Sequence, residues 1–447
     1  MNKTTFLLWR SALVAGLGGI LFGFDVSVIA GTNELMRAEF SLSPAQLGFT
    51  VSSAFYGTLT GIVLAGFAST RIGRRDSLKI AALLYLVSAV GCGLSWDWYS
   101  LVIFRIIGGL GVGASAVLGP MYIAEISPSH RRGQLVALFQ MSIVLGILLA
   151  YTSNAIIGTF QFPPPQEWRL KFAGEAVPAI AFFLALFTIP RSPRWLLTRG
   201  KNEEAANVLE LLGEEDTVEA KNAIAESLQT KKNKRAVDLF QRKYIPSILL
   251  AFCVGIFNNL AGINGVLYYL NSIFESAGFS KASGDIQSVA VGVTNLVFTV
   301  IAMLCIDRMG RKKLLLIGSL GLAPILFAIA AIYHYQQNEF LLLPLLIAYI
   351  AFFAFSQGTV IWVYLSEIFP NAVREKGLTL GSFVAWTAGT IVAWFFPIMT
   401  DYAASFPFIV FGISMIIQFV LVWKYFPETK GVPLERIEQM VTFPDRS

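Results

Sequence analysis

The chain has 447 residues, of which 55% are hydrophobic and only 14% are charged, and its formal net charge is +6. A soluble domain with one core does not need so apolar a composition, so the composition argues against a soluble protein and for one that resides in the lipid bilayer. The positive charges gather in alternate loops between apolar stretches, a pattern that indicates membrane topology rather than nucleic-acid binding. The three cysteines lie inside apolar stretches without metal-ligand spacing, so we expect no disulfide, metal site or cofactor.

Twelve apolar stretches are long enough to cross a bilayer, which takes about 20 helical residues. In chain order they are 8–31, 45–69, 78–95, 99–124, 133–157, 169–189, 245–272, 284–306, 313–334, 340–366, 376–400 and 404–425. The first stretch contains Asp25 and lacks a small-residue cleavage site, so we expect a retained helix rather than a signal peptide. The sequence therefore predicts an all-α membrane protein with six transmembrane helices in each half.

The polar interval between the halves divides the chain. We expect an N-terminal six-helix bundle at 1–190, cytoplasmic linker helices at 191–243, a C-terminal six-helix bundle at 244–426 and a cytoplasmic tail at 427–447. The linker combines mixed charge with helical apolar spacing, which favours a connector that anchors topology over a regulatory segment. Because Lys and Arg concentrate in this interval and in alternate loops, we expect both termini to be cytoplasmic.

Loop motifs of the first half recur in the second. Glu125 is followed seven residues later by Arg132, and Glu367 is followed seven residues later by Arg374. The run 71–75, RIGRR, recurs at 308–312 as RMGRK, and PRSPR at 190–194 is echoed by PETKG at 427–431. A duplicated, mostly apolar chain indicates a transporter with two similar halves.

These motifs suggest a latch at the cytoplasmic helix ends. We expect the Glu and the Arg of each seven-residue motif to bond across neighbouring helix ends, with the cations of the glycine turns beside helix C-termini. Such contacts could hold the ends together in one conformation and release them in another. The alternative, that the charges only set orientation, does not explain the equal spacing in both halves. The latch candidates are Arg74, Glu125, Arg132, Arg311, Glu367 and Arg374.

Three ionisable residues share one level in the outer half of the predicted N-terminal bundle. Asp25, Arg105 and Glu175 are each about 10 Å from the outer end of a predicted helix, at 1.5 Å per residue. An unpaired Asp or Arg at a helix centre costs roughly 2.5 to 3.5 kcal/mol, so we expect Asp25 and Arg105 to pair. The residues alone support two interpretations equally: a carboxylate whose proton affinity changes between conformations, and a static salt bridge between helices.

Neutral polar and aromatic side chains within the apolar stretches could bind an uncharged ligand rich in hydroxyls. For any one amide, a hydrogen bond between helices explains the residue equally well, but the set favours a binding site. Gly262 and Gly265 flank Asn264, so we expect the helix to be interrupted there. The candidates are Gln140, Asn258, Asn259, Asn264, Asn295, Trp362, Trp386, Tyr268 and Tyr269.

Over nearly its whole length the chain resembles the sugar porter family of the major facilitator superfamily. The matching segments are RIGRR, RIIGGLGVG, PMYIAEISP with RRG, SPRWLL, GINGVLYY, DRMGRKK, WVYLSEIFPNAVR and PETKG. The resemblance implies a two-bundle, twelve-helix fold that works by alternating access. It also implies a multi-pass protein of the cytoplasmic (inner) membrane that functions as a monomer.

The resemblance implies roles for the buried charges. Asp25 is expected to carry the proton, Arg105 to be its partner and Glu175 to be a supporting carboxylate. Facilitative relatives generally lack the Asp, so its presence favours proton coupling over a static bridge.

The resemblance also implies a sugar site at Gln140, Asn264, Asn295, Trp362 and Trp386. Asn258 and Asn259 stand where relatives commonly carry two glutamines. Tyr268, with Tyr269, is expected to be an extracellular gate, with ordinary aromatic packing as an equal alternative. Ile147 stands where some pentose-specific relatives carry Gln, which favours a hexose, although packing explains an isoleucine as well.

Four residues depart from the family pattern, namely Thr70, Arg191, Thr359 and Ala385. We expect them to alter the sugar preference and the latch of the first half. The sequence thus predicts a proton-coupled monosaccharide symporter, with glucose as first substrate and xylose or arabinose next. A sugar facilitator without coupling is the alternative, and a non-transporting sugar sensor is disfavoured by the short tail. An enzyme is not expected, because His130 and His334 lie in loops without nucleophile or metal partners.

Overall fold

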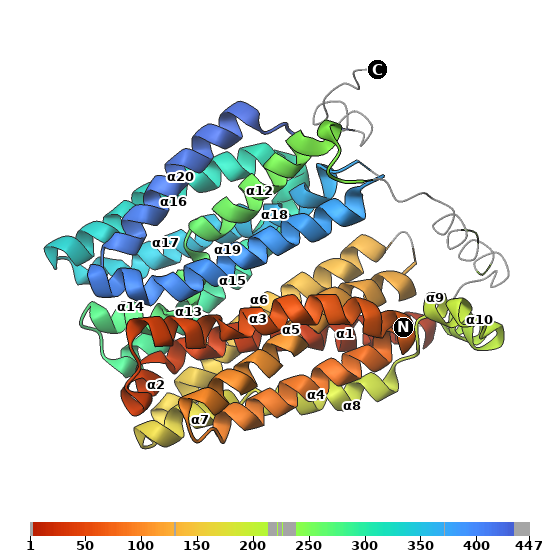
Figure 1. The fold of residues 1–447 in the computed structure, drawn as a ribbon, viewed down its shortest axis with the longest axis horizontal. Coiled ribbons are helices and arrows are strands. Elements are labelled where there is room, and N and C mark those ends of the chain that lie inside the picture. Colours follow the sequence, from red (N-terminus) through yellow and green to blue (C-terminus); the bar gives the residue numbers. More distant parts are fainter. Residues whose placement is uncertain are drawn as a thin grey trace. The chain divides into compact units, whose positions relative to one another are not determined.

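The computed structural model describes residues 3–128, 131–212, 221, 226, 238–370 and 372–432. All regular elements in these residues are helices (Figure 1), and twelve helical stretches are long and apolar enough to cross a membrane. The predicted all-α, twelve-helix fold class is therefore confirmed. The chain packs as two compact units: unit 1 comprises 1–28, 53–153 and 161–236, and unit 2 comprises 29–52, 154–160 and 237–447.

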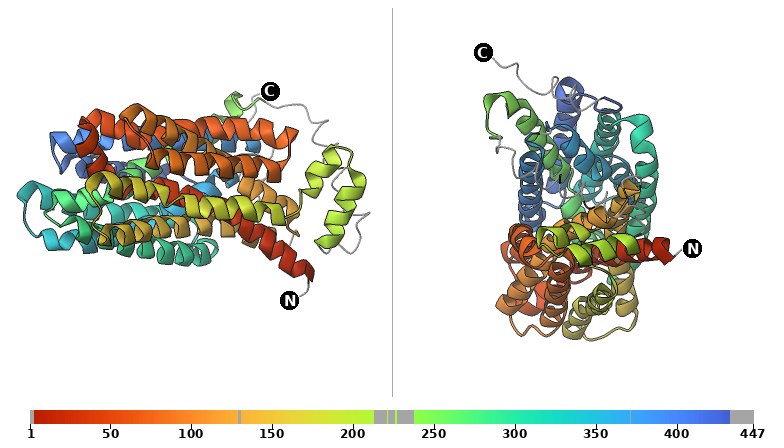
Figure 2. Two further views of the ribbon diagram at one scale, coloured as in Figure 1. Left: turned by 90° about the horizontal axis from the view of Figure 1, so that it is seen from below. Right: turned by 90° about the vertical axis from the view of Figure 1, so that its right-hand side faces the viewer.

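Unit 1 is built from helices of the first half. They are α1 (Lys3–Val28), α3 (Pro44–Arg71), α4 (Arg74–Gly93), α5 (Trp98–Ile126), α6 (Arg132–Thr159), α7 (Pro164–Ala173) and α8 (Ala176–Ala185), followed by η2 (Leu186–Thr188). Of these, α3 begins in unit 2 and α6 ends there. Within the predicted linker, α9 (Pro193–Thr198) and α10 (Asn202–Leu211) lie beyond one end of these long helices (Figure 2). The basic run 231–235, His130 and most of the tail lie outside the described residues.

Small residues bring the helices of unit 1 into backbone contact. A Cβ added to Gly109 would lie 1.9 Å from the carbonyl oxygen of Ala54, and one added to Gly57 would lie 2.0 Å from that of Ile106. A Cβ on Gly113 would likewise lie 2.1 Å from the carbonyl oxygen of Thr58. The glycine-rich run of α5 is thus a surface for close helix packing, as expected of small residues in membrane helices.

The core of unit 1 is apolar, and its outer helix faces are apolar as well. Tyr85, Tyr122 and Phe182 are fully buried in this core, whereas Val63 and Phe67 on α3 are largely exposed. Exposed apolar side chains along a helix are costly in water but match a hydrocarbon solvent.

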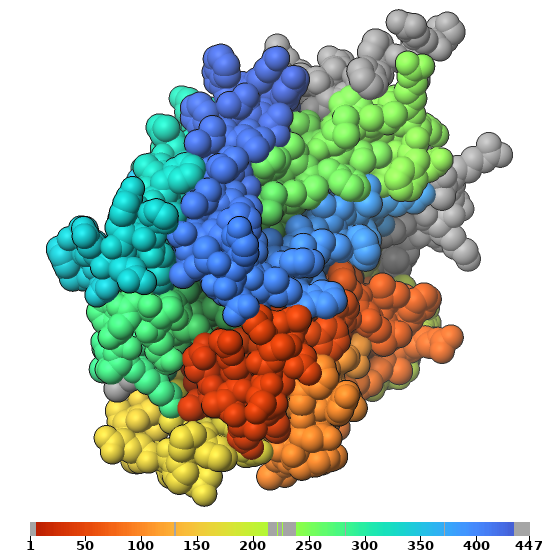
Figure 3. Space-filling model, turned by 60° about the vertical axis from the view of Figure 1, so that its left-hand side comes forward, coloured from red at the N-terminus to blue at the C-terminus, as the bar shows by residue number. Residues whose placement is uncertain are grey.

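Unit 2 contains η1 (Ile29–Gly31), α2 (Asn33–Phe40) and the second-half helices. These are η3 (Arg242–Tyr244), α12 (Ile245–Leu260), α13 (Ile263–Tyr268), α14 (Leu270–Ser276), α15 (Lys281–Met309), α16 (Arg311–Tyr335), η4 (Glu339–Leu341), α17 (Leu342–Phe355), α18 (Gln357–Glu367), α19 (Arg374–Tyr402) and α20 (Phe406–Tyr425). Within unit 2, α16 and α20 pack along each other, and their surfaces adjoin in Figure 3.

Two of the predicted apolar stretches of unit 2 are interrupted, the first where a break is expected and the second where none is. The stretch 245–272 breaks at Gly262, whose φ of +93° suits glycine, and a Cβ there would lie 2.3 Å from the Phe411 ring. The break precedes Asn264, as the flanking glycines predict. The stretch 340–366 breaks at Ser356, where φ is −117° and ψ is −91°. Asn264 follows the first break by two residues, and Trp362 follows the second by six.

Candidate functional site

Asp25 and Arg105 form a fully buried ion pair in unit 1. Arg105 Nη1 on α5 donates to Asp25 Oδ1 on α1 at 2.8 Å, and the side chains are 2% and 1% exposed. The same nitrogen lies 3.3 Å from the Asp25 carbonyl oxygen. Gly108 leaves room for the pair, because a Cβ there would lie 2.4 Å from Ser88 Oγ and 3.3 Å from Asp25 Oδ1. The structure thus brings together the two residues that the sequence pairs.

Glu175 adds a second carboxylate to this pair. It lies between α7 and α8, is buried, and interacts electrostatically with both Asp25 and Arg105. The Phe172 ring, three residues earlier, lies 5.6 Å from the Arg105 guanidinium carbon, within cation–π range. Asp25 Oδ2, Arg105 Nε and Glu175 Oε1 are buried without a hydrogen-bond partner among the described residues. The cluster therefore holds two carboxyl groups, one guanidinium and spare hydrogen-bonding capacity.

The amides of α12 and α13 are linked to one another and to neighbouring backbone. Asn264 Nδ2 donates to Asn259 Oδ1 at 2.9 Å, and Asn259 Nδ2 donates to the Ala385 carbonyl oxygen at 2.9 Å and to the Gly255 carbonyl oxygen at 3.0 Å. Asn258 Nδ2 donates to the Gln357 carbonyl oxygen at 3.2 Å. The donors of Asn258 and Asn259 thus serve the helix-to-helix role that was the alternative to ligand binding. Ala385, one of the four departures from the family pattern, contributes its backbone carbonyl.

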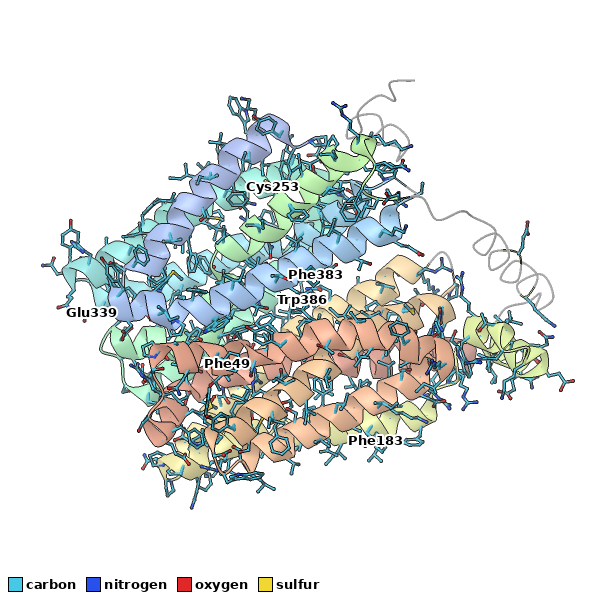
Figure 4. The ribbon with its side chains drawn as sticks, in the orientation of Figure 1. Phe49, Phe183, Cys253, Glu339, Phe383 and Trp386 are labelled. Atoms are coloured by element: carbon cyan, nitrogen blue, oxygen red, sulfur yellow. The ribbon has the colours of Figure 1, made fainter. Side chains whose placement is uncertain are left out.

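The other sugar-site candidates of unit 2 lie on three further helices. Asn295 on α15 is buried, and Trp362 on α18 is 40% exposed. Trp386 on α19 is half-buried and lies one turn after Phe383 (Figure 4). Their roles remain predictions.

The two candidates of unit 1 lie on α6. Gln140 is half-buried, and Ile147 is buried. A Cβ added to Gly23 of α1 would lie 2.8 Å from the Ile147 backbone nitrogen, so α1 and α6 cross in close contact there.

The predicted gate residues follow the break at Gly262. Tyr268 and Tyr269 are both buried, and the Asn33 amide on α2 donates to the Tyr268 carbonyl oxygen at 2.7 Å. The Tyr269 hydroxyl donates to the Ala393 carbonyl oxygen at 2.9 Å, and its ring stacks on Phe396 at 5.0 Å between centroids. The Tyr269 and Phe396 rings form part of the wall of a cavity of about 300 Å³ within unit 2.

A three-part cluster joins the loop motifs of unit 1. Arg74 Nη2 lies 2.9 Å from Glu125 Oε1, and Ser192 Oγ donates to Glu125 Oε2 at 2.5 Å. The departure at Arg191 is matched by Asp76 in the first turn of α4, because Arg191 Nη2 lies 3.0 Å from Asp76 Oδ2. The three motifs that the sequence repeats thus meet at one end of the unit.

Unit 2 repeats this cluster with its own motifs. Arg311 Nη2 lies 2.8 Å from Glu367 Oε1, and Thr429 Oγ1 donates to Glu367 Oε2 at 2.5 Å. Glu428 accepts from the backbone N–H groups of Arg311 at 2.9 Å and of Lys312 at 3.2 Å. Its carboxylate therefore lies at the N-terminus of α16, where the helix dipole favours negative charge.

The pairing expected within each seven-residue motif is corrected by these clusters. Arg132 is exposed, and the Glu125 carboxylate is occupied by Arg74 and Ser192. Arg374 Nε donates to the Phe369 carbonyl oxygen at 3.2 Å, while Glu367 bonds to Arg311. Each glutamate thus pairs with the arginine of the glycine turn, which sequence spacing alone could not identify because the partners are about fifty residues apart in the chain.

Comparison with known proteins identifies the family. A family model described as "Sugar (and other) transporter" matches residues 11–441. The chain belongs to this sugar transporter family. It is 39% identical to the D-xylose-proton symporter of Escherichia coli (strain K12) over 471 residues, covering 97% of this chain and 95% of the relative. It is 36% identical to the arabinose-proton symporter of Bacillus subtilis (strain 168) over 432 residues, covering 95% and 93%.

A solved structure matches the fold of this sugar transporter. The inward open conformation of the xylose transporter XylE from E. coli aligns with a TM-score of 0.86 at 37% identity, covering 97% of this chain and 100% of that one. Family membership and this match confirm the predicted resemblance and the predicted transporter class. The twelve candidate membrane-crossing helices further make this family member a multi-pass membrane protein.

Sequence reasoning missed three buried polar contacts. Lys171 on α7 is 0% exposed and lies 2.9 Å from Glu167, and Gln357 Nε2 donates to Gln418 Oε1 at 2.9 Å. Asp285 accepts from Asn271 at 2.6 Å. The first has a readable signal, because Glu167 and Lys171 are four residues apart, the spacing at which opposite charges on a helix attract. The other two join separate helices, and no spacing predicts them.

Proposed function

We propose that this protein is a proton-coupled monosaccharide symporter of the cytoplasmic (inner) membrane that works by alternating access as a monomer. The observation that carries the proposal is the fully buried Asp25–Arg105 pair with Glu175 beside it. Charged groups at membrane depth are costly and mark ion or proton pathways. The names of the two bacterial relatives, which are proton symporters, support the same conclusion.

Protonation of Asp25 would release its hold on Arg105. Removing one partner of a buried ion pair typically costs about 3 to 5 kcal/mol, so the paired and protonated states differ enough to favour different conformations. A carboxylate that is paired in one conformation and hydrated in another binds its proton with different affinity in each, which couples proton movement to the change. The nearby Glu175 carboxyl and the unsatisfied Asp25 Oδ2 give the cluster capacity to hold that proton.

The sugar would be held by neutral groups rather than by charge. Asn264 and Asn295 supply amides, and Trp362 and Trp386 supply aromatic faces for a sugar ring. The relatives named for xylose and arabinose support a pentose, whereas the sequence expectation of glucose rests on Ile147. We therefore place xylose and arabinose before glucose as substrates to test.

The positive-inside rule supports the orientation. The two motif clusters and the basic loops that carry them would face the cytoplasm, together with both termini. Asp97, between α4 and α5, and Asn33 of α2 would then lie toward the outside. Sulfhydryl labelling of single cysteines introduced at Asp97 and at Lys201 in intact cells would test this assignment.

Uptake into proteoliposomes tests the proposed function. We expect labelled xylose, arabinose or glucose to accumulate above its external concentration when an inward proton gradient is imposed, and only to equilibrate without one. Equilibration that ignores the gradient would instead indicate a facilitator, with Asp25–Arg105 as a static bridge. Absence of uptake of any of these sugars by correctly inserted protein would contradict the assignment of a monosaccharide transporter.

A further inference from the structure

A buried polar network joins α14 to α15 within unit 2. Asn271 Nδ2 donates to Asp285 Oδ1 at 2.6 Å, and Ser288 Oγ lies 2.9 Å from Asn271 Oδ1. All three side chains are less than 5% exposed, at 4%, 2% and 1% in that order. Neither the sugar site nor the proton cluster uses this carboxylate, so it needs its own explanation.

Apolar contacts also hold α14 against α15. Phe274 of α14 is fully buried, and a Cβ added to Gly284 of α15 would lie 3.6 Å from the Phe274 Cβ. The short connection turns at Gly278, whose φ is +87°, and Ser280 caps α15 by accepting from the Ser283 N–H at 3.3 Å. α14 is therefore held against α15 by polar contacts of Asn271 and by an apolar contact of Phe274.

The predicted gate residues come directly before α14. Tyr268 ends α13, and Tyr269 breaks the helix with φ of −113° and ψ of 20°. Their contacts away from α15 include neutral hydrogen bonds, from Asn33 to the Tyr268 carbonyl and from the Tyr269 hydroxyl to the Ala393 carbonyl, and the stacking of Tyr269 on Phe396. The gate tyrosines thus make neutral contacts with α2 and α19, whereas α14, which follows them, is bound to the Asp285 carboxylate of α15.

These two kinds of contact differ in how readily they separate. A hydrogen bond to a charged group is stronger than a neutral one, and a carboxylate left without its donor in a dry interior bears a large desolvation penalty. The 2.6 Å distance from Asn271 to Asp285 is typical of a strong bond. Lys281 precedes Asp285 by four residues on α15, the spacing at which opposite charges on a helix attract. Movement of the gate should therefore break the contacts of Asn33 and Ala393 before those of Asp285.

We propose that Asp285 is a positioning residue of the gate, which acts through Asn271 to make α14 and α15 one rigid body. The gate then opens by bending at Gly262 and Tyr269, and α14 does not leave α15. This inference rests on the proposed transport function, because a gate and its hinge have a role only in a transporter. In this role Asp285 does not contact the substrate. It holds α14 in place while Tyr268 and Tyr269, which precede α14, move.

Alanine variants test the bond in transport. We expect Asp285→Ala and Asn271→Ala each to lower the maximal rate of sugar counterflow about tenfold, equivalent to ~1.4 kcal/mol in the barrier, with little change in the sugar concentration for half-maximal rate. The double variant should be no slower than either single variant, because both remove the same bond. A rate that falls additively, or is unchanged, would overturn the inference.

The reversed pair separates positioning from a general structural defect. In Asn271→Asp with Asp285→Asn, donor and acceptor exchange places, and the new carboxylate can still accept from Ser288. We expect this variant to transport within about twofold of the parent, whereas failure to recover would contradict the inference. Asp285→Asn alone keeps a neutral acceptor and should fall between the parent and the alanine variant. Glu339→Ala, in the exposed turn between α16 and α17 (Figure 4), is the control and should leave the rate unchanged.

Hydrogen exchange keeps the test independent of sugar transport. In purified protein without sugar, Asp285→Ala should raise amide exchange in 270–278 at least tenfold more than in 245–260, and the reversed pair should restore protection. If the parent moves no sugar, this result still decides whether Asp285 fastens α14. Equal exchange in the parent and Asp285→Ala would overturn the rigid-body assignment whatever the transport result.

Discussion

The motif clusters of unit 1 and unit 2 show what a repeated sequence keeps and what it changes. Both keep an arginine of a glycine turn, a glutamate at a helix end and a hydroxyl that donates to that glutamate at 2.5 Å. In chain order these are Arg74, Glu125 and Ser192 in unit 1, and Arg311, Glu367 and Thr429 in unit 2. The glutamate accepts from both partners in each unit, so the repeat preserves a hydrogen-bonding arrangement as well as the charges.

The surroundings of the two clusters carry opposite charges. Unit 1 places a base in the loop, Arg191, opposite an acid in the first turn of α4, Asp76. Unit 2 places an acid in the loop, Glu428, and the residue that corresponds to Asp76 is Lys313. Glu428 bonds to backbone N–H groups at the start of α16 instead of to a side chain. In both units the loop residue is thus attached to the first turn of a helix, by an ion pair in unit 1 and by backbone hydrogen bonds in unit 2, and Arg191 is compensated by Asp76.

The largest difference should appear when the glutamates are neutralised. Arg311 keeps a second carboxylate, Asp307, at 3.0 Å, whereas the second partner of Arg74 is the neutral Ser69 carbonyl. We therefore expect Glu125→Gln to cost about 2 kcal/mol and Glu367→Gln about 1 kcal/mol, between the values for surface and buried pairs. The measurement is thermal unfolding of the purified variants at one heating rate.

The control for this pair is an exposed ion pair of the same type. Glu204 lies 2.7 Å from Lys201 in the linker, with both side chains more than 40% exposed, so Glu204→Gln should leave the unfolding temperature unchanged. A larger loss from Glu367→Gln than from Glu125→Gln would break the proposed asymmetry of the two clusters.

A smaller effect should follow from changing the loop charge in unit 1. Arg191→Glu places two carboxylates side by side, and because the Arg191 side chain is 36% exposed we expect a loss of only a few tenths to about 1 kcal/mol. Adding Asp76→Lys converts the site to the charge pattern of unit 2 and should recover at least half of the loss. Thermal unfolding of the single and double variants measures this, and an equal or greater loss in the double variant would refute the complementarity.

The smallest effect concerns the opposite end of unit 1. The Ser100 backbone N–H, at 2.8 Å from Asp97 Oδ1, and the Ser100 hydroxyl hold the pKa of Asp97 below its usual range. A lowered pKa stabilises the fold above the unfolded value of about 3.9 and loses that contribution as pH falls through the folded value. In unit 2, η4 and α17 start without a side-chain cap bond.

Acid sensitivity of this cap can be measured by substitution. Asp97→Asn keeps a capping side chain that does not titrate, so its unfolding temperature should approach or exceed that of the parent below pH 4, while at pH 7 the parent should be slightly more stable. A difference between parent and variant that does not depend on pH would show that the charge of Asp97 contributes nothing.

Patterns local in the chain predicted most of the fold. Apolar length predicted the twelve membrane-crossing stretches, and the glycines around Asn264 predicted the break in the seventh. Asp25 and Arg105 could be paired from their depth, because a buried charge at membrane depth requires a partner.

Contacts between distant segments were less predictable. The partner of Glu125 is Arg74 rather than Arg132, since the pairing depends on how α4 and α5 pack and not on spacing along one loop. No sequence pattern predicts the Asn271–Asp285 bond either, because it depends on how α14 packs against α15. For Asn259 the sequence left ligand binding and a hydrogen bond between helices open, and the structure shows its amide nitrogen donating to the backbone carbonyls of Gly255 and Ala385.

The most direct test of proton coupling is transport by Asp25→Asn, compared with the parent and the Glu339→Gln control. Asparagine keeps the size of the side chain but can neither carry the proton nor form the ion pair with Arg105. In proteoliposomes we expect Asp25→Asn to lose accumulation driven by an inward proton gradient while counterflow of labelled xylose continues, and the control to retain both. Gradient-driven accumulation by Asp25→Asn, or loss of counterflow with the protein correctly inserted, would contradict the assignment of Asp25 as the proton carrier.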